Sequence, residues 1–471
     1  MMSFKSITTI KINLFLVFLF LISFSYVQAE DYPEYIIQDG DYLSYVADLF
    51  NTTVNDILAI NNIADVNAIS IGTRIKIPTL AGISGTINTS TINVGDTLQN
   101  IGILSNMPIS MIASMNRLTS PTELFIGKTI ITVADDKAAS ISAVETLQNE
   151  QTIIEKAALL NINPYLLSKI NQTSDLCSFA DNQIIFSKIN SNNNETNTTI
   201  HKISPIVDEI EIHPLPLVQG ETHVVHVKSS KVLSLSGKLY DQNLRFFQDT
   251  DKPYDWYAMV GINAMADVGL TDFLLTGNDS DGNSFSIDQR VIVQAGQFTT
   301  EVVEGVDAST LDESANKEDE TAVHSLTQTS STRTWGDYMS YPVDSPCFAS
   351  GFGSRRTYND GSFHNFHDGT DFSVCAADNI NIYAAADGTV IFAQEIPVHG
   401  NYTVIDHGWG VYTSYSHQSE IKVTVGQQVK RGDIIGLIGS TGRSVGPHLH
   451  WEVLINSVYV NALTWINTKF P

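Results

Sequence analysis

Two stretches near the C-terminus of the 471-residue chain combine residues that can bind a metal ion. The sequence HDGTD sets His367 and Asp371 four residues apart, and GPHLHWEV, residues 446–453, sets His448 and His450 two residues apart. Neutral imidazole and carboxylate are ordinary zinc ligands. His367 and Asp371, with one of the two later histidines, would give three protein ligands and leave a fourth position open. Three ligands with an open position are typical of a catalytic zinc site, whereas structural sites are closed by four.

An extended strand would position the later pair of histidines. Side chains in a strand alternate between its faces, so His448, His450 and Glu452 would share one face, with the two imidazoles about 7 Å apart. The apolar residues between them would then face a core. A fifth member of the set, His417, ends a predicted strand at residues 411–416. The stretch around it alternates short apolar runs with glycine turns, which predicts antiparallel β structure.

The order of these motifs is similar to that of the lysostaphin-type zinc metallopeptidases, the LytM family. HxxxD comes first, YxH follows and HLH comes last. The match covers about residues 335–468 and includes FGSRR at 352–356 and GQQVKRGDIIGLIGSTG at 426–442. So many motifs in one order make a chance match improbable, and the C-terminal domain is expected to have the antiparallel β fold of that family.

The resemblance implies a role for each of the five residues. By matched position, His367, Asp371 and His450 would bind one Zn²⁺ per catalytic domain, and His417 and His448 would be the catalytic pair beside it. The family acts on peptide bonds in bacterial cell-wall cross-links or stems. Zinc lowers the pKa of bound water toward about 7, while a histidine can transfer a proton or stabilise the oxyanion. The resemblance does not say which of the two histidines does which.

Three neighbouring polar residues are expected to take no part in this chemistry. Glu452 lies at the far end of the strand face that carries His450. Asp368 would point away from the ligand beside it in an extended chain, and His399 has no cluster of ligands around it.

The N-terminal part of the chain contains a repeat. Residues 35–78 combine a short strand, two amphipathic helices and a closing strand, and residues 91–133 repeat this βααβ order with a matching Gly-Asp turn. A third, degenerate copy spans 145–187 and lacks that turn. These units resemble LysM domains, which implies that they bind glycans containing N-acetylglucosamine, such as peptidoglycan or chitin. The alternative is that these small helical repeats bind no glycan and serve only as spacers for the rest of the chain.

The resemblance also implies where the first copy would contact a glycan. The loop after the first strand and the loop before the last strand would form the groove. The predicted glycan-binding residues are Gly40, Asp41, Tyr42, Leu43, Asn67, Ile69 and Ile71.

The first residues have the layout of a secretory signal peptide, predicted at 1–29. Lys5 and Lys11 precede the apolar run Leu14–Ile22, and Val-Gln-Ala at 27–29 supplies a small-residue cleavage site. No other segment is apolar enough to cross a bilayer, so no membrane span is expected in the mature chain. We therefore expect a secreted or cell-envelope protein, periplasmic or wall-associated. The formal net charge of −25 argues against nucleic acid and anionic lipid as partners.

The rest of the chain divides into four segments that differ in composition and hydrophobic pattern. Residues 188–202 form a polar linker, 203–303 contain short strands typical of an Ig-like β-sandwich, 304–334 form an acidic linker or solvated helix, and 335–471 form the peptidase domain. The fold class is therefore a multidomain combination of α+β and β domains. Of the three cysteines, Cys347 and Cys375 flank one segment and are the expected disulfide pair, which leaves Cys177 over.

The leading hypothesis is thus an exported zinc metalloendopeptidase of peptidoglycan, held on its substrate by the repeats. One alternative is a non-hydrolytic regulator of other wall hydrolases. Another is a wall- or chitin-binding protein with a vestigial peptidase domain. The sequence does not show which cross-link would be cut, nor the oligomeric state.

Overall fold

The computed structural model of the chain describes residues 31–65, 69–134, 143–147, 151–173, 176, 179, 183–187, 203–327, 331–359, 363–375 and 379–471. The predicted leader, the predicted linker at 188–202 and Cys177 lie outside these residues. None of the described helices has the length and hydropathy that a bilayer span requires. The chain divides into two compact units, of which one holds the first repeat and the other holds residues Thr89–Ile130 and everything from Ala139 onward.

The first repeat has the predicted βααβ order. Its elements are β1 (Glu34–Ile36), α2 (Leu43–Leu49), α3 (Val54–Asn61) and β2 (Arg74–Lys76). Strand β1 pairs with β2 in antiparallel register, with Tyr35 opposite Ile75. Thr53 caps α3 by accepting a hydrogen bond from the backbone N–H of Asp56, and Asn62 ends the helix in a left-handed conformation. Helix α2 buries Leu43, Val46 and Ala47, the face that the sequence spacing predicts.

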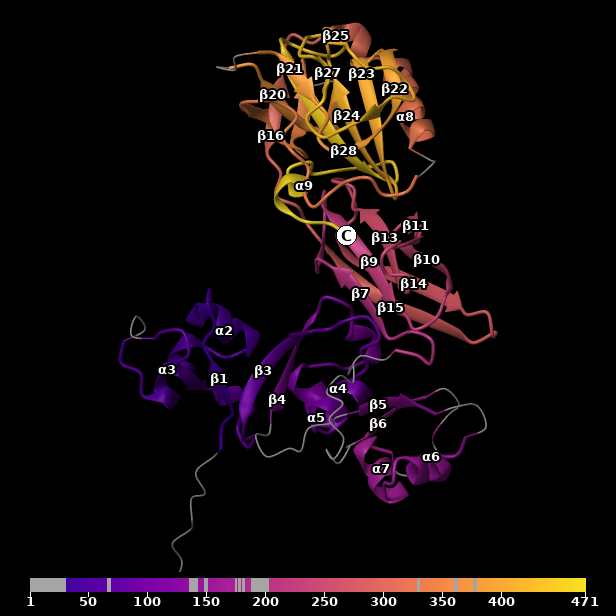
Figure 1. The fold of residues 1–471 in the computed structure, drawn as a ribbon. Coiled ribbons are helices and arrows are strands. Elements are labelled where there is room, and N and C mark those ends of the chain that lie inside the picture. The colour runs from indigo at the N-terminus through magenta and orange to yellow at the C-terminus, as the bar shows by residue number, and fades with distance from the viewer. Residues whose placement is uncertain are drawn as a thin grey trace, which may run out of the picture. The chain divides into compact units, whose positions relative to one another are not determined.

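The second and third repeats follow the same order (Figure 1). The second contains β3 (Thr86–Thr91), α4 (Leu98–Leu104), α5 (Ile109–Met115) and β4 (Thr129–Ala134). The third contains β5 (Ala143–Thr146), α6 (Ile153–Leu159), α7 (Pro164–Ile170) and β6 (Ile184–Ser187). Strands β5 and β6 pair in antiparallel register.

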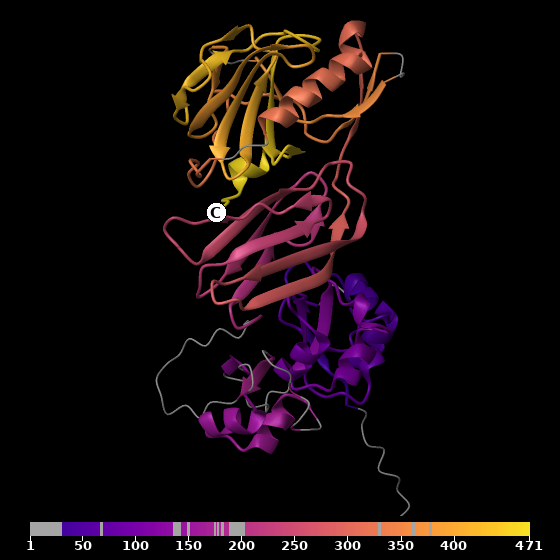
Figure 2. The same cartoon turned by 90° about the vertical axis from the view of Figure 1, so that its right-hand side faces the viewer.

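The central region consists of two sheets (Figures 1 and 2). Their strands are β7 (Glu209–His213), β8 (Leu217–Val218), β9 (Thr222–Lys228), β10 (Ser234–Leu239), β11 (Gln242–Asn243), β12 (Phe247–Gln248), β13 (Asp255–Gly261), β14 (Gly269–Asn278) and β15 (Ser284–Gln294). One sheet has the order β11-β10-β14-β15-β8 and the other has the order β12-β13-β9-β7. Alternate residues of both sheets, such as Val225 and Phe273, join one apolar core cluster. The Ig-like assignment of this region stays a prediction.

The C-terminal region is built around a large antiparallel sheet with the order β17-β20-β28-β24-β23-β22-β26, and β29 pairs with β28 (Figure 1). The strands are β17 (Phe348–Ser350), β20 (Thr370–Ser373), β22 (Gly388–Ile396), β23 (Gly400–Gly408), β24 (Val411–Ser416), β26 (Gln428–Val429), β28 (His448–Ile455) and β29 (Val458–Val460). A smaller sheet is formed by β21 (Asn381–Tyr383), β27 (Ile434–Leu437) and β25 (Glu420–Ile421). The chain ends after helix α9 (Thr464–Asn467).

Strand β28 has the two faces that the sequence predicts. Leu449, Trp451 and Val453 are fully buried in the domain core, while His448, His450 and Glu452 lie on the opposite face. Neighbouring strands fix the register, since Asp371 of β20 lies opposite His450.

The acidic segment 304–334 contains a helix, one of the two predicted alternatives, but one side of this helix is buried and not solvated. The helix is α8 (Glu313–Leu326), and β16 (Thr300–Val303), at the end of the predicted sandwich, precedes it. Strand β16 pairs in parallel with β18 (Arg355–Tyr358), which forms a hairpin with β19 (Phe363–Phe366). Helix α8 lies beside β22 (Figures 1 and 2), and Val323 packs into an apolar cluster with Tyr402. The physical reason is that Val323 and Leu326 give this otherwise polar helix an apolar face.

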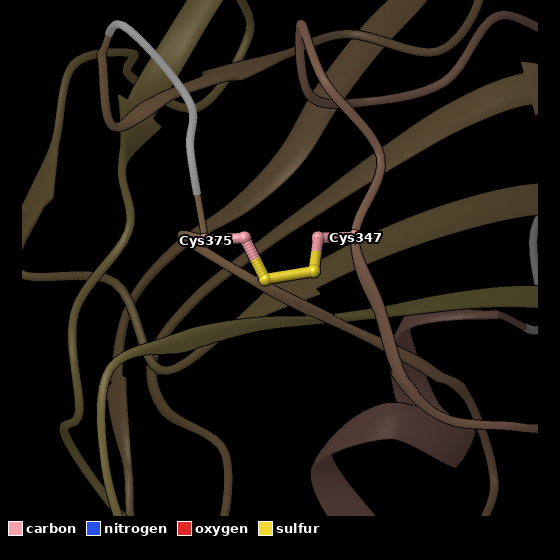
Figure 3. Close-up of a disulfide and its surroundings, with 2 residues drawn as sticks. All are labelled: Cys347 and Cys375. Atoms are coloured by element: carbon pink, nitrogen blue, oxygen red, sulfur yellow. A yellow bond between two sulfur atoms is a disulfide. The ribbon is translucent and has the colours of Figure 1, made fainter.

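The structure contains the expected disulfide between Cys347 and Cys375 (Figure 3). It joins the segment before β17 to the end of β20, which is the strand that carries Asp371. The cross-link therefore closes a loop around residues that lie beside the candidate site.

Candidate metal centre

Three side chains converge on one point in the C-terminal domain. His367 precedes β20, Asp371 lies on β20 and His450 lies on β28. The Nε2 atom of His367 is 3.0 Å from Asp371 Oδ1 and 3.0 Å from His450 Nδ1, and the last two atoms are 2.9 Å apart. All three residues are buried. Gly369 permits this approach, because a Cβ atom there would lie 2.8 Å from the ring of His450.

Hydrogen bonds on the far side of each ring set its tautomer. The Nδ1–H group of His367 donates to the carbonyl oxygen of Gly351 at 2.8 Å, so its Nε2 lone pair faces the centre. The Nε2–H group of His450 donates to the carboxylate of Glu452 at 2.9 Å, so its Nδ1 lone pair faces the centre. In these tautomers His367 Nε2, His450 Nδ1 and one oxygen of Asp371 face a common point.

This donor set fits a zinc ion. Ligands of a tetrahedral zinc with bonds near 2.0–2.1 Å lie about 3.3 Å apart, close to the distances between these atoms. A divalent cation bound between these atoms would interact favourably with the carboxylate and with the lone pairs of the neutral rings. Two imidazole nitrogens and one carboxylate oxygen are also the ligand types of catalytic zinc sites with an open position.

A second pair of histidines lies beside this centre. The rings of His417 and His448 are 4.8 Å apart, and His448 Nε2 is 3.8 Å from Asp371 Oδ1. His417 Nδ1–H donates to the carbonyl of Thr441 at 2.7 Å, and His448 Nδ1–H donates to the carbonyl of Gly446 at 2.8 Å. Both rings therefore keep an Nε2 lone pair that can accept a proton.

The backbone of His417 is held in an unusual conformation. It follows directly after β24, and its φ of 60° lies in the left-handed region that non-glycine residues rarely adopt. Such strain persists where the surrounding structure fixes it, and it is concentrated at functional sites. Burial and the neighbouring rings of His448 and His450 lower the pKa of His417 well below its ordinary value.

The five predicted residues meet at a cavity of about 230 Å³, which is lined by four of them and adjoins His367. The other lining residues come mainly from β16, β18 and the loops before β23 and β28. They are Glu301, Val303, Val306, Ser350, Arg356, Tyr358, Phe366, Asp368, Val398, His399, Arg443, Ser444 and Val445. The structure thus brings together every residue of the predicted catalytic and metal-binding set.

Comparison with known proteins identifies the domain. The family model for peptidase family M23 matches residues 365–462, and the model for the LysM domain matches residues 35–78 and 91–132. The C-terminal domain is a peptidase family M23 domain. The first two repeats are LysM domains.

The M23 domain is similar to two curated enzymes of Vibrio cholerae serotype O1. The peptidoglycan DD-endopeptidase ShyA is 42% identical over 127 residues, which are 27% of this chain and 29% of ShyA. The peptidoglycan DD-endopeptidase ShyB is 42% identical over 125 residues, 26% of this chain and 29% of ShyB. The chain thus matches about three tenths of the length of these relatives. A solved structure, a putative peptidase M23 from Pseudomonas aeruginosa, is 24% identical with a TM-score of 0.40, covering 55% of this chain and 97% of that one.

A hydrogen-bond network lies behind His450 and contains Glu452, His399 and Asp368, which are not among the residues predicted for the site. Glu452 is fully buried and accepts hydrogen bonds from the Nε2–H of His450, from His399 Nε2 at 3.1 Å and from the hydroxyl of Tyr402 at 3.0 Å. Ser414 also donates to it. Asp368 Oδ1 lies 3.3 Å from the same Nε2 atom of His450. The alternation along β28 already placed Glu452 beside His450, so this partner could have been found from the sequence.

The network continues to the acidic helix. Asp319 of α8 is buried and accepts hydrogen bonds from His399 Nδ1–H at 2.6 Å and from the backbone N–H groups of Val398 and His399. Burial opposes protonation of His399, yet Glu452 and Asp319 raise its pKa to about 9. A charged His399 therefore lies between two carboxylates and fixes the orientation of Glu452.

Asp371, the predicted carboxylate ligand, also has an outer partner. Its Oδ2 atom accepts a hydrogen bond from Arg356 Nη2 at 2.8 Å, and Arg356 Nε donates to Glu301 at 3.2 Å. Ser350 donates to the same Glu301 carboxylate. Although burial raises the pKa of Asp371, the rings of His367 and His450 hold it well below the ordinary value. The carboxylate is thus ionised, as a metal ligand must be.

The predicted glycan-binding residues of the first LysM domain differ in their exposure to solvent. Tyr42 and Ile71 are 74% and 66% exposed. Asp41 accepts hydrogen bonds from Gln38 N–H and from the hydroxyl of Tyr35, so it stabilises the turn. Gly40 is exposed, and Ile69 is half-buried. The side chain of Leu43 belongs to the domain core, and Asn67 lies outside the described residues.

Proposed function

We propose that the chain is a zinc-dependent metalloendopeptidase that hydrolyses peptide bonds in bacterial peptidoglycan cross-links or stems. One observation carries this proposal: two imidazole nitrogens and one carboxylate oxygen meet within 3.0 Å of one another, beside two histidines whose Nδ1–H groups are held by backbone carbonyls. The relatives named peptidoglycan DD-endopeptidases support the substrate class. The LysM matches support binding to the glycan part of the same polymer.

The protein's own residues supply binding, orientation and proton transfer. His367, Asp371 and His450 would hold the zinc, which supplies Lewis acidity when bound. His417 and His448 can each accept a proton from a water molecule at Nε2, because their Nδ1–H groups are held by backbone carbonyls. Once protonated, either ring can return the proton to the leaving amine or stabilise the negative oxygen that forms on the scissile carbonyl. The burial of the ligands excludes bulk water and strengthens these electrostatic effects.

The N-terminal segments would bring the catalytic domain to its substrate. The leader at 1–29 would direct export to the cell envelope, and the LysM repeats would keep the catalytic domain close to its substrate by raising its effective concentration. The proposed segments are 1–29, 35–78, 91–133, 145–187, 188–202, 203–303, 304–334 and 335–471, with the central one an Ig-like sandwich. The second and third repeats would share the LysM fold of the first.

The test combines metal analysis with a wall-digestion assay on the full mature chain. We expect about one zinc per chain, new amino termini in purified peptidoglycan, and loss of both zinc and hydrolysis on His450→Ala. The matched control is His324→Ala, which changes a histidine of α8 outside the cavity that holds the metal centre. A chain that binds zinc and peptidoglycan but releases no peptide fragments would contradict the enzymatic proposal.

A further inference from the structure

The two LysM domains have the same turn after their first strand. In the first domain, the carboxylate of Asp41 accepts a hydrogen bond from the backbone N–H of Gln38 at 2.7 Å. In the second, the carboxylate of Asp96 accepts one from the backbone N–H of Asn93 at 2.7 Å. The two turns therefore have matching geometry.

The loop before the last strand also matches between the two domains. The N–H of Gly72 donates to the carbonyl of Ile37 at 2.8 Å, and the N–H of Gly127 donates to the carbonyl of Ile92 at 2.9 Å. Both glycines have a φ between 85° and 88°, the left-handed region that favours glycine. The two candidate glycan grooves are thus built alike, and any difference between them comes from what surrounds them.

The groove of the first domain is open. Tyr42 and Ile71, one from each loop, are 74% and 66% exposed. A Cβ atom built at Gly40 or at Gly72 would meet no heavy atom within 4 Å in the part of the chain that the structure describes.

The corresponding groove of the second domain is covered. Ile126, which stands where Ile71 stands in the first domain, is fully buried, and Val94 is 5% exposed. Both belong to the apolar core cluster of the central sheets. A Cβ atom built at Gly95 would lie only 3.2 Å from the side chain of Ile203.

Strand β15 of the central region makes polar contacts with both loops of the second domain. The side chain of Gln289 accepts a hydrogen bond from the N–H of Gly95 at 2.7 Å and donates to the carbonyl of Asp96 at 3.2 Å. The N–H of Ile126 donates to the carbonyl of Arg290 at 2.8 Å. Strand β15 therefore provides hydrogen-bond partners for backbone groups in both loops of the second domain.

We propose that the second LysM domain uses its glycan-binding surface to hold the central sheets, so that of the two LysM domains only the first binds glycan. This inference rests on the proposed glycan binding of the first domain. A duplicated binding module has in this way become an internal docking module. The chain would accordingly bind one chito-oligosaccharide through these two domains.

The test is a calorimetric titration of the full mature chain with the hexamer of N-acetylglucosamine. We expect one hexamer per chain, and at least about tenfold weaker binding after Tyr42→Ala, which removes an exposed aromatic anchor. The matched variant is Thr97→Asn, at the equivalent position of the second domain. It keeps a residue able to cap α4 and should leave affinity and stoichiometry unchanged. Two hexamers per chain, or a loss of binding on Thr97→Asn, would overturn the proposal.

A second measurement separates failure of this inference from failure of the proposed function. Amide hydrogen exchange at Gly95 and Ile126 should be slow in the ligand-free chain, and Gln289→Ala should speed it at Gly95. If no hexamer binds but these amides are protected, the glycan-binding proposal fails while the docking role of the second domain stands. Rapid exchange at both positions would show that the second groove is open and would refute the inference.

Discussion

Replacement of Glu452 by glutamine tests how far the protein controls the protonation of a metal ligand. The carboxylate is fully buried, and its two oxygens accept hydrogen bonds from the rings of His450 and His399 and from the hydroxyls of Tyr402 and Ser414. The amide of glutamine has only one acceptor oxygen. Its NH₂ group must therefore face either the two rings or the two hydroxyls.

The hydroxyls offer the better partner for the new NH₂ group, because each can turn and accept a hydrogen bond. The amide oxygen would then stay on the rings, and His450 would keep the Nδ1 lone pair that faces the metal centre. What is lost is the negative charge. Hydrogen bonds to charged groups contribute about 1.5–3 kcal/mol and neutral ones about 0.5–1.5 kcal/mol, so the orienting bond on His450 weakens by roughly 1–1.5 kcal/mol.

This loss corresponds to about tenfold in zinc affinity, since 1.4 kcal/mol is a factor of ten, and outer partners of metal-bound histidines typically contribute 10–100-fold. If the NH₂ group faced the rings instead, His450 would carry its proton on Nδ1, and the loss would be larger. The assay is competition for zinc with a chromophoric chelator on the full chain, with Glu420→Gln as the control because that carboxylate is exposed in the same domain. A folded Glu452→Gln chain whose zinc affinity lies within twofold of the parent would refute this reasoning.

Three further predictions concern the catalytic pair, the acidic helix and the central sheets. The variants His417→Ala and His448→Ala should each keep about one zinc per chain but release peptides about 10²–10⁴-fold more slowly. Metal analysis and mass spectrometry of the released fragments measure the two quantities. A rate near that of the parent would contradict proton transfer by the ring that was removed. Asp319→Asn should lower the free energy of unfolding by about 2–4 kcal/mol in denaturant titrations, because it removes the charge partner of the buried His399. Glu318→Gln, on the exposed side of the same helix, should change this free energy little. Burial lowers the pKa of His223 to about 4. Between pH 6.5 and 4 the unfolded chain therefore binds a proton that the folded chain does not, so the free energy of unfolding falls as the pH falls, by at most about 3 kcal/mol. His223→Gln should flatten this pH dependence, and an unchanged slope would exclude the assignment to His223.

Part of the arrangement of the candidate metal set could be predicted from the sequence by local rules. Alternation along a strand places His448, His450 and Glu452 on one face, and the spacing in HDGTD brings His367 and Asp371 to one end of the neighbouring strand. The same alternation predicted the buried face of Trp451. The alternation and the spacing depend only on neighbours within a few residues, whereas the choice of His450 over His448 came from the family resemblance and the pairing of β20 with β28 is tertiary.

The roles of His399 and Asp319 could not be predicted in this way. His399 reaches Glu452 through the pairing of distant strands, and Asp319 reaches His399 because α8 lies against the sheet. The acidic run offers Glu318, Asp319 and Glu320 in succession, and composition does not distinguish them. One signal was present, since Asp319 precedes Val323 by one helical turn and therefore shares the apolar side of the helix.

The repeats show the same division between local and tertiary information. Both LysM units and their matching loops could be predicted from self-similarity along the chain, and the structure confirms the βααβ order of each. The covering of the second groove depends on β15, which lies more than a hundred residues later. A weak local signal exists, because the turn position that holds Asp39 in the first domain holds Val94 in the second, and a buried turn favours the apolar residue.

The two outer hydrogen-bond networks extend the catalytic unit beyond the range that the M23 family model matches. Asp371 is held by Arg356, whose other partner is Glu301 of β16. His450 is held by Glu452, which reaches Asp319 of α8 through His399. Both networks therefore end on residues that precede the matched range of 365–462. Because metal affinity depends on how rigidly the ligands are oriented, we expect Glu301 of β16 and Asp319 of α8 to contribute to metal binding at the predicted site.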